Sequence, residues 1–414
     1  MRKILIVGAG QGGLQLALSL QAEGYDVTLM SARTPEEMRS GRVMSTQGMF
    51  GPALQLERER GLNLWEEQTP KIGFLHVTVA GPPGTPALSF PAPFSEYVQS
   101  VDQRVKMAGW LELFSQRGGN VVYHSVMTSD MEGLTSLYEL TIIAAGKGEV
   151  VELFDRDPAR SPFSAPQRAL ACIYVHGMRP RPDHPGTHVG ISVNPGLAEL
   201  FTIPAFTTTG PCDILFWEAI PGGPIDRFGD RPDPQAHLAR TLDLMREYTP
   251  WEYARCTEVE PTDARATLTG GYTPVVRHPV GRLPGSSFVL GMGDVVVAND
   301  PICAAGANNA SHCASIYFRS IIERGRKPFD PEWMQHTFDA YWDYARWPTA
   351  FSNMMLGPLP SYVQRVLGFA AQNPTVARRF AHGYENPADL HNWLMDPAKL
   401  EAYLASVTGE PAEG

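Results

Sequence analysis

Four glycines near the start of the chain form a pattern that binds phosphate groups in many proteins: Gly8, Gly10, Gly12 and Gly13. They follow a short apolar strand over residues 3–7 and open a helix predicted over residues 12–23. In this G-x-G-x-x-G spacing, Gly8 makes the tight turn, Gly10 lets the backbone approach a pyrophosphate, and Gly13 lets the helix pack closely on the strand. The pattern therefore predicts a dinucleotide-binding site, and a glycine-rich turn without a ligand is the alternative.

The strand predicted next, over residues 25–30, lacks the acidic residue that usually follows it. In NAD- and FAD-binding folds, Asp or Glu at this place holds the ribose hydroxyls. Here Ser31 and Ala32 stand at this position, and Arg33 follows. We therefore expect weaker binding of a resting dinucleotide. Arg33 is assigned to the cofactor site, where contact with a 2′-phosphate is an alternative role.

Composition and charge exclude several classes of protein. A net charge of −10 disfavours a nucleic-acid partner. The five cysteines are scattered without a C-x-x-C motif, which fits reduced thiols and disfavours a disulfide framework. No run of 18 apolar residues and no signal peptide is recognisable, so we expect a cytoplasmic chain without a membrane span. His184 and His188 are separated by Pro185 and Gly186, which disfavours a helical metal site, and no metal is expected.

The order of the predicted elements indicates an α/β protein with an inserted β-rich domain. Residues 1–150 and 286–330 are predicted to form a discontinuous Rossmann-like domain. Short strands punctuated by Gly and Pro over residues 151–285, with part of residues 45–100, predict a β-rich substrate-binding domain. Residues 331–414 are predicted to form a helical C-terminal region.

Three separated pieces of the chain together resemble flavoprotein monooxygenases of the p-hydroxybenzoate hydroxylase-like fold. They are the glycine motif, Ala144-Ala145-Gly146, and Gly293-Asp294 with Asp300-Pro301 and Gly306-Ala307-Asn308. The resemblance implies that Asp294 contacts the ribityl–pyrophosphate part of FAD and that Pro301 and Ile302 flank the isoalloxazine ring. Asn308 is assigned either to helix capping or to the polar edge of the flavin. The complete predicted FAD site is Gly8, Gly10, Gly12, Gly13, Arg33, Arg42, Gly146, Asp294, Pro301, Gly306, Ala307 and Asn308.

Finer features resemble the two-component styrene and indole monooxygenases over nearly the whole chain. The motifs are Ser40-Gly41-Arg42, Val101-Asp102-Gln103-Arg104, Arg160-Ser161-Pro162-Phe163, Pro166-Gln167-Arg168-Ala169-Leu170 and Arg346-Trp347. The resemblance implies that a separate NAD(P)H:flavin reductase delivers FADH2 and that the oxygenase is a homodimer. It also implies that O2 forms a C4a-hydroperoxyflavin, which transfers one oxygen atom to a double bond.

A five-residue motif separates the two subgroups in this resemblance. Styrene-type enzymes carry Asn-x-Val-x-His, whereas indole-type enzymes carry Ser-x-Gln-x-Met. Residues 45–49 read Ser-Thr-Gln-Gly-Met, which resembles the indole type. Downstream, either Ile72 and Leu75 or, with a one-residue shift, Gly73 and His76 occupy the positions that are Tyr and His in the styrene type.

These observations predict an FADH2-dependent monooxygenase that epoxidises indole or a related aryl alkene. The predicted catalytic residues are Arg42, Ser45 and Thr46. The predicted substrate-binding residues are Gln47, Met49, Phe206, Phe216, Trp217 and Ile302. Three alternatives remain open: a tailoring oxygenase for a larger indole or a sulfide, a single-component NAD(P)H oxidoreductase, and a non-catalytic flavin-binding protein.

Overall fold

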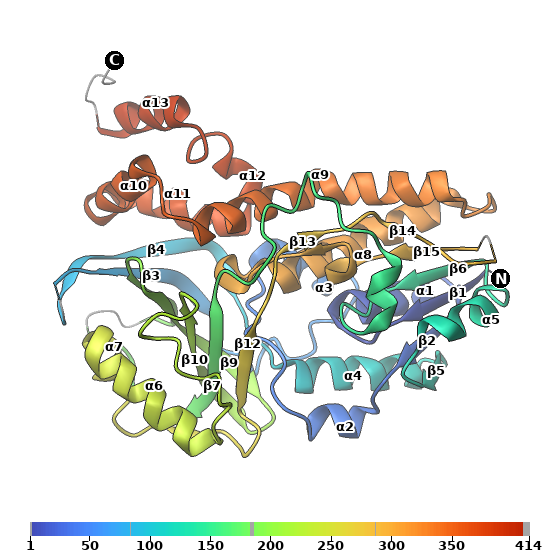
Figure 1. Cartoon of the computed structure of the whole chain (residues 1–414), viewed down its shortest axis with the longest axis horizontal. Helices are drawn as coiled ribbons and strands as arrows, with labels where there is room; N and C mark the ends of the chain where they lie inside the picture. The colour runs from blue at the N-terminus through green and yellow to red at the C-terminus, as the bar shows by residue number, and fades with distance from the viewer. Residues whose placement is uncertain (1, 83, 183–185, 286, 409–414) are drawn as a thin grey trace.

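The computed structural model describes residues 2–408 except residues 83, 183–185 and 286, and it contains two large sheets (Figure 1). The first is six-stranded, in the order β14 (Val280–Arg282), β15 (Phe288–Gly291), β6 (Leu140–Ile143), β1 (Lys3–Val7), β2 (Asp26–Ser31) and β5 (Asn120–Tyr123). All neighbours are parallel except β14 and β15. From β1 the chain builds outward first through β2 and β5 and later through β6 and β15. Ligands of such open sheets bind beyond the carboxyl ends of the strands at this reversal of order.

The second sheet is eight-stranded and mostly antiparallel, with β3 and β8 as its parallel pair. Its order is β11 (Glu260–Pro261), β7 (Ala169–His176), β10 (Gly210–Ala219), β9 (Ala198–Thr207), β8 (His188–Asn194), β3 (Ile72–Ala80) and β4 (Pro86–Val98), and β12 (Thr267–Gly271) also pairs with β7. The predicted α/β class with an inserted β-rich part is confirmed. One domain boundary differs from the predicted one. Residues 280–282 fall within the predicted β-rich domain, but they form β14, which belongs to the first sheet.

Helices flank both sheets (Figure 1). They are α1 (Gln11–Ala22), α2 (Pro35–Arg39), α3 (Gly51–Arg58), α4 (Gln103–Gln116), α5 (Met131–Thr135), α6 (Pro234–Tyr248), α7 (Pro250–Tyr253), α8 (Ala305–Arg324), α9 (Pro331–Leu356), α10 (Ser361–Gln372), α11 (Pro374–Glu385), α12 (Pro387–Leu390) and α13 (Pro397–Thr408). Several begin with proline, whose fixed φ suits the first helical position. Asp233 and Asp330 cap α6 and α9 through their side chains.

Helix α9 connects the two hydrophobic cores of the molecule. Phe338 and Tyr341 are buried in the core around the parallel sheet, whereas Phe351 is buried in the core of the β-rich sheet and the C-terminal helices. The aromatic residues at helical spacing in α9 therefore include core residues from both halves. No helix within the described part of the chain is long and apolar enough to cross a membrane.

The glycine turn between β1 and α1 is closely packed on one side. A Cβ atom at Gly13 would lie 2.1 Å from the carbonyl oxygen of Gly8. Gly8 itself has a φ of 121°, which side chains rarely tolerate. The spacing of the glycines thus predicted the close packing of helix on strand that the structure shows.

We expect Gly13→Ala to lower the free energy of unfolding by about 3 kcal/mol, because backbone atoms cannot make room for the methyl group. Gly368→Ala in α10 is the matched control, since a Cβ there meets nothing within 4 Å. The control should be neutral or slightly stabilising. Urea titration of both variants measures the difference, and equal stabilities would contradict the packing argument.

Candidate active site

Four segments meet at the carboxyl edge of the parallel sheet. A Cβ at Gly8 would lie 2.6 Å from the backbone nitrogen of Ala145, at the end of β6. One at Gly146 would lie 2.7 Å from the Cβ of Asp294, beyond β15. One at Gly12 would lie 3.3 Å from the carbonyl oxygen of Ala310 in α8. The structure therefore brings together the glycine motif, the ends of β6 and β15, and α8.

This edge fits an anionic dinucleotide. A Cβ at Gly10, Gly293 or Gly306 would meet nothing within 4 Å, so the backbone is open on these sides. Neither α1 nor α8 has a side-chain cap at its N-terminus, which leaves backbone N–H groups for a ligand. The open glycine backbone and the two uncapped helices are the features that could hold FAD.

Asp294 follows β15 at this edge. Its side chain reaches solvent, yet the surrounding protein displaces water from the carboxyl and raises its pKa to about 6, against the opposing effect of Lys147 and Arg277. Near neutral pH the carboxylate is still mostly ionised. It can then accept hydrogen bonds from sugar-type hydroxyl groups.

Polar side chains support the turn from behind. Gln11 donates a hydrogen bond to Glu57 (2.9 Å), and the buried Glu57 also pairs with Lys106. At the end of β2, the hydroxyl of Ser31 bonds to the carbonyl oxygen of Arg33 (2.6 Å), and the guanidinium of Arg33 is exposed beside Met44. The edge therefore has a cation where many dinucleotide sites have a carboxylate.

The segment of residues 45–50 is anchored to three elements. Met49 and Gln99 exchange two backbone hydrogen bonds (2.8 and 3.1 Å). Asn308 of α8 donates to the carbonyl oxygen of Gly48 (2.7 Å) and accepts from the backbone N–H of Phe50 (3.0 Å). Its second amide hydrogen bonds to Ala304 (2.8 Å). The structure thus gives the side chain of Asn308 a role in positioning this segment.

The third anchor is Tyr174 of β7, which the sequence analysis did not identify. Its hydroxyl donates to the carbonyl oxygen of Ser45 (2.8 Å) and accepts from Gln47 (3.3 Å). The hydroxyl of Ser45 bonds to Gln47 (2.5 Å) and accepts from Gln103 (3.1 Å). Burial raises the pKa of Tyr174 well above its usual range, so its hydroxyl stays neutral. No sequence signal identifies this tyrosine, because its partners are more than 120 residues away.

Side-chain alternation places the three aromatic residues predicted to bind substrate on different faces of the β-rich sheet. Tyr174 lies opposite Ile214 in the β7–β10 register, so Phe216, two residues further, points to the same face as Tyr174. We call this the inner face. Trp217 and Phe206 point to the other face, the outer face. Of the three aromatic residues predicted to bind substrate, Phe216 therefore shares the inner face beside Gln47, whereas Trp217 and Phe206 point away from it.

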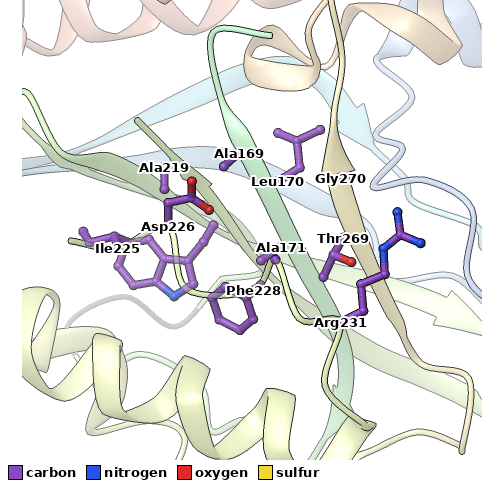
Figure 2. A pocket seen from close by; sticks show the side chains of 12 residues that line it. Ala169, Leu170, Ala171, Ala219, Ile225, Asp226, Phe228, Arg231, Thr269 and Gly270 are labelled. Atoms are coloured by element: carbon purple, nitrogen blue, oxygen red, sulfur yellow. The ribbon is translucent and has the colours of Figure 1, made fainter. Parts of the chain in front are cut away.

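Trp217 instead lines a pocket of about 210 Å³ on the outer face. Figure 2 shows this pocket with Ile225 and Phe228 at one side and Thr269 and Arg231 at the other. Arg231 also lines a second, open pocket of about 500 Å³ that includes Arg42. Arg42 is exposed at this opening.

The remaining predicted residues are distributed around α8. Pro301 and Ile302 form a short 3-10 turn before α8, and the Ile302 side chain is buried in the core of the β-rich sheet. Ala307 packs against the small cluster of Met49, Ala53 and Leu54, in which Met49 is 2% exposed. Thr46 is half-buried in the anchored segment.

His184 lies outside the described residues. Among the described residues, no group of three or more His, Cys, Asp or Glu side chains could hold a metal ion.

A buried guanidinium joins the two halves beside this segment. Arg104 of α4 donates to Asp102 (2.8 Å), to both oxygens of Asp263 (3.2 and 3.0 Å), to Thr207 of β9 (3.0 Å) and to the carbonyl oxygen of Gly41 (3.4 Å). All five of its N–H groups are used. Burial alone would raise the pKa of Asp263, but hydrogen bonds from Arg104 and from the Arg265 backbone outweigh it and lower that pKa.

We expect Arg104→Met to lower the free energy of unfolding by about 3–5 kcal/mol, because it leaves the fully buried Asp102 without its cation. Arg39→Met is the matched control, since the ion pair of Arg39 with Glu112 is solvent-exposed. The control should cost at most about 1 kcal/mol. Chemical denaturation compares the two variants. A similarly small decrease in the free energy of unfolding in both would contradict the role of Arg104 in connecting the two halves.

Solved structures with a similar fold are flavin enzymes. A flavoprotein/dehydrogenase from Cytophaga hutchinsonii superposes with a TM-score of 0.67 at 13% identity, covering 94% of both chains. The p-nitrophenol 4-monooxygenase PnpA from Pseudomonas putida DLL-E4 superposes with a TM-score of 0.62 at 13% identity, covering 94% of this chain and 99% of PnpA. These similarities show the fold, a Rossmann-like domain with a second, β-rich domain.

Sequence comparison points to a narrower group. Residues 146–255 match the family model described as the styrene monooxygenase A putative substrate binding domain. The chain is also 29% identical over 411 residues to styrene monooxygenase StyA from Pseudomonas fluorescens, and 96% of each protein is covered. The chain is thus similar to styrene monooxygenases over nearly its whole length, and residues 146–255 are similar to their putative substrate-binding domain.

Proposed function

We propose that this chain is the oxygenase component of a two-component flavin monooxygenase. It takes FADH2 from a separate NAD(P)H:flavin reductase, uses O2, and epoxidises indole or a related aryl alkene. The observation that carries the proposal is the place of residues 45–50. This segment bridges α8, at the dinucleotide edge, and the inner face of the β-rich sheet.

The polar groups of the segment support oxygen transfer rather than acid–base chemistry. The bound flavin supplies the oxygen-transfer chemistry, and the protein supplies binding and orientation. The protons of Ser45 and Tyr174 are held in internal hydrogen bonds. A site whose protons are held in this way does not offer one to a reactive oxygen and so avoids wasteful release of H2O2. In this proposal Arg42 supplies positive charge to the anionic reduced flavin.

A single turnover tests the proposal directly. The purified protein is mixed anaerobically with photoreduced FAD, and air is then admitted in the presence of indole or styrene. Indigo or an epoxide, formed without reductase or NADH, is the expected result. Intact substrates with only H2O2 and oxidised FAD would overturn the proposed substrate class.

The rival function is a single-component NAD(P)H oxidoreductase that reduces its own flavin. Its distinguishing property is NADH consumption by the purified protein with FAD but without any reductase. We expect no consumption above the buffer control. A non-catalytic flavin-binding protein would instead bind FAD and yield no oxygenated product.

Gly10→Ala tests the dinucleotide edge separately from folding. The added methyl group meets no protein atom within 4 Å, so the free energy of unfolding should change by no more than about 1 kcal/mol. It occupies the side on which a pyrophosphate would approach, so the dissociation constant for FAD should rise at least about tenfold. Flavin fluorescence titration measures this, and unchanged affinity would place the pyrophosphate elsewhere.

The double variant Gln47→Val with Met49→His tests the subgroup assignment. These changes move the motif toward the styrene type, so the ratio of styrene to indole turnover should rise several-fold. Tyr174 keeps its hydrogen bond to the backbone of Ser45 in this variant, which preserves one anchor of the segment. Product analysis in the single-turnover assay measures the ratio. An unchanged ratio would remove both positions from the specificity argument.

A further inference from the structure

Two buried carboxyl groups meet where the β-rich sheet contacts the turn before α8. Glu218 lies on the inner face of β10 and is fully buried, as is Asp300. Within the described part of the chain, no N–H or hydroxyl group donates to either oxygen of Glu218 or to Oδ2 of Asp300. The two side chains instead lie close enough to hydrogen-bond to each other. Two carboxyl groups can form such a bond only when one of them carries a proton.

The nearest cation does not supply the missing donors. Arg168 donates to both oxygens of Glu199 (2.8 and 3.0 Å). Its other N–H groups bond to the carbonyl oxygens of Gln167 (3.1 Å), Leu356 (3.1 Å) and Met355 (3.4 Å). All five donors of the guanidinium are therefore used. Arg168 can attract the carboxyl pair over a distance but cannot hydrogen-bond to it.

The charges around the pair favour proton uptake. Glu199 lies directly opposite Glu218 in the β9–β10 register, so three carboxyl groups face one guanidinium. Cys303 and Tyr384 also face this cluster, and burial raises the pKa of each well above its usual range, which keeps both neutral. Burial and the neighbouring carboxylates raise the pKa of Glu218 well above its usual range as well.

Asp300 is the carboxyl group of the pair that ionises more readily. Its Oδ1 accepts a hydrogen bond from the backbone N–H of Ile302 (3.1 Å) and so caps the turn Pro301–Cys303. A backbone donor favours the ionised form of a carboxyl group. Glu218 has no such donor among the described residues, so it is the member of the pair that holds the proton.

We propose that Glu218 is protonated in the folded protein and donates a hydrogen bond to Asp300, and that it thereby acts as a positioning residue for the turn before α8. The turn is strained, because Ala304 has a φ of 52°. Fixing Asp300 on both oxygens holds this geometry and the start of α8. The link to flavin binding rests on the proposed function, whereas the protonation of Glu218 does not.

Infrared spectroscopy of the flavin-free protein tests the protonation. Asp213 contributes a carboxylic-acid C=O band of its own near neutral pH, because burial raises its pKa to about 7. We therefore expect the intensity of this band to fall in Glu218→Gln and to stay unchanged in the surface control Glu112→Gln. The glutamine variant should fold, because its amide can donate to Asp300 in place of the acid. Absence of the band from the wild-type protein, or an unchanged band intensity in Glu218→Gln, would overturn the proposal.

Stability against pH gives a second readout. The folded protein keeps a proton on Glu218 that the unfolded chain releases at the usual glutamate pKa. Rising pH should therefore increase the unfolding equilibrium constant by up to about tenfold per pH unit until the folded pKa is reached. Glu218→Gln should lack this contribution, so the ratio of the two constants changes with pH. A pH-independent ratio would contradict a proton held on Glu218.

FAD affinity tests the positioning role. Glu218→Gln should bind FAD nearly as the wild type does, because it keeps the donor to Asp300. Glu218→Met, which removes that donor, should bind at least about tenfold more weakly. Equal affinity in all three would overturn the positioning role. If the wild-type protein binds no FAD at all, the proposed function fails, while the infrared and stability results still decide where the proton is.

Discussion

The candidate active site depends on one buried guanidinium. Arg104 has five N–H groups in a fixed planar arrangement, and each needs an acceptor once water is removed. The acceptors come from α4, from the backbone before residues 45–50, from β9 and from the loop that carries Asp263. These elements must hold their relative positions for the charge to remain buried. The constraint places residues 45–50 between the two sheets with little freedom.

Local patterns predicted much of the fold from the sequence. The glycine motif occupies six consecutive residues, and the closest approach that it requires, between Gly13 and Gly8, lies within the same turn. The strand predicted at residues 3–7 coincides with β1. α8 begins at Ala305 directly after a left-handed Ala304, and because no side chain caps the helix, no local signal marks its start. Elements with local signals were thus predictable, and this boundary was not.

The site was less predictable, because its contacts are distant in sequence. Asp263 is 159 residues from Arg104, and Tyr174 is 129 residues from Ser45. Neither pair has a spacing that indicates contact. Phe216 and Trp217 are a different case, since adjacent residues in a strand point to opposite faces. That rule separates the two side chains from sequence alone, but only the pairing of β7 with β10 identifies which one shares a face with Tyr174.

Three buried charged clusters beside the β-rich sheet differ in how they are neutralised. Arg104 meets the carboxylates of Asp102 and Asp263, and Arg168 meets Glu199 and backbone carbonyls. Guanidinium groups stay charged at any pH that a folded protein tolerates, so these two clusters persist over a wide range. The cluster of Glu218 and Asp300 has no guanidinium donor and needs a proton. Its strength must therefore follow pH, and it is the cluster next to the turn that leads into α8.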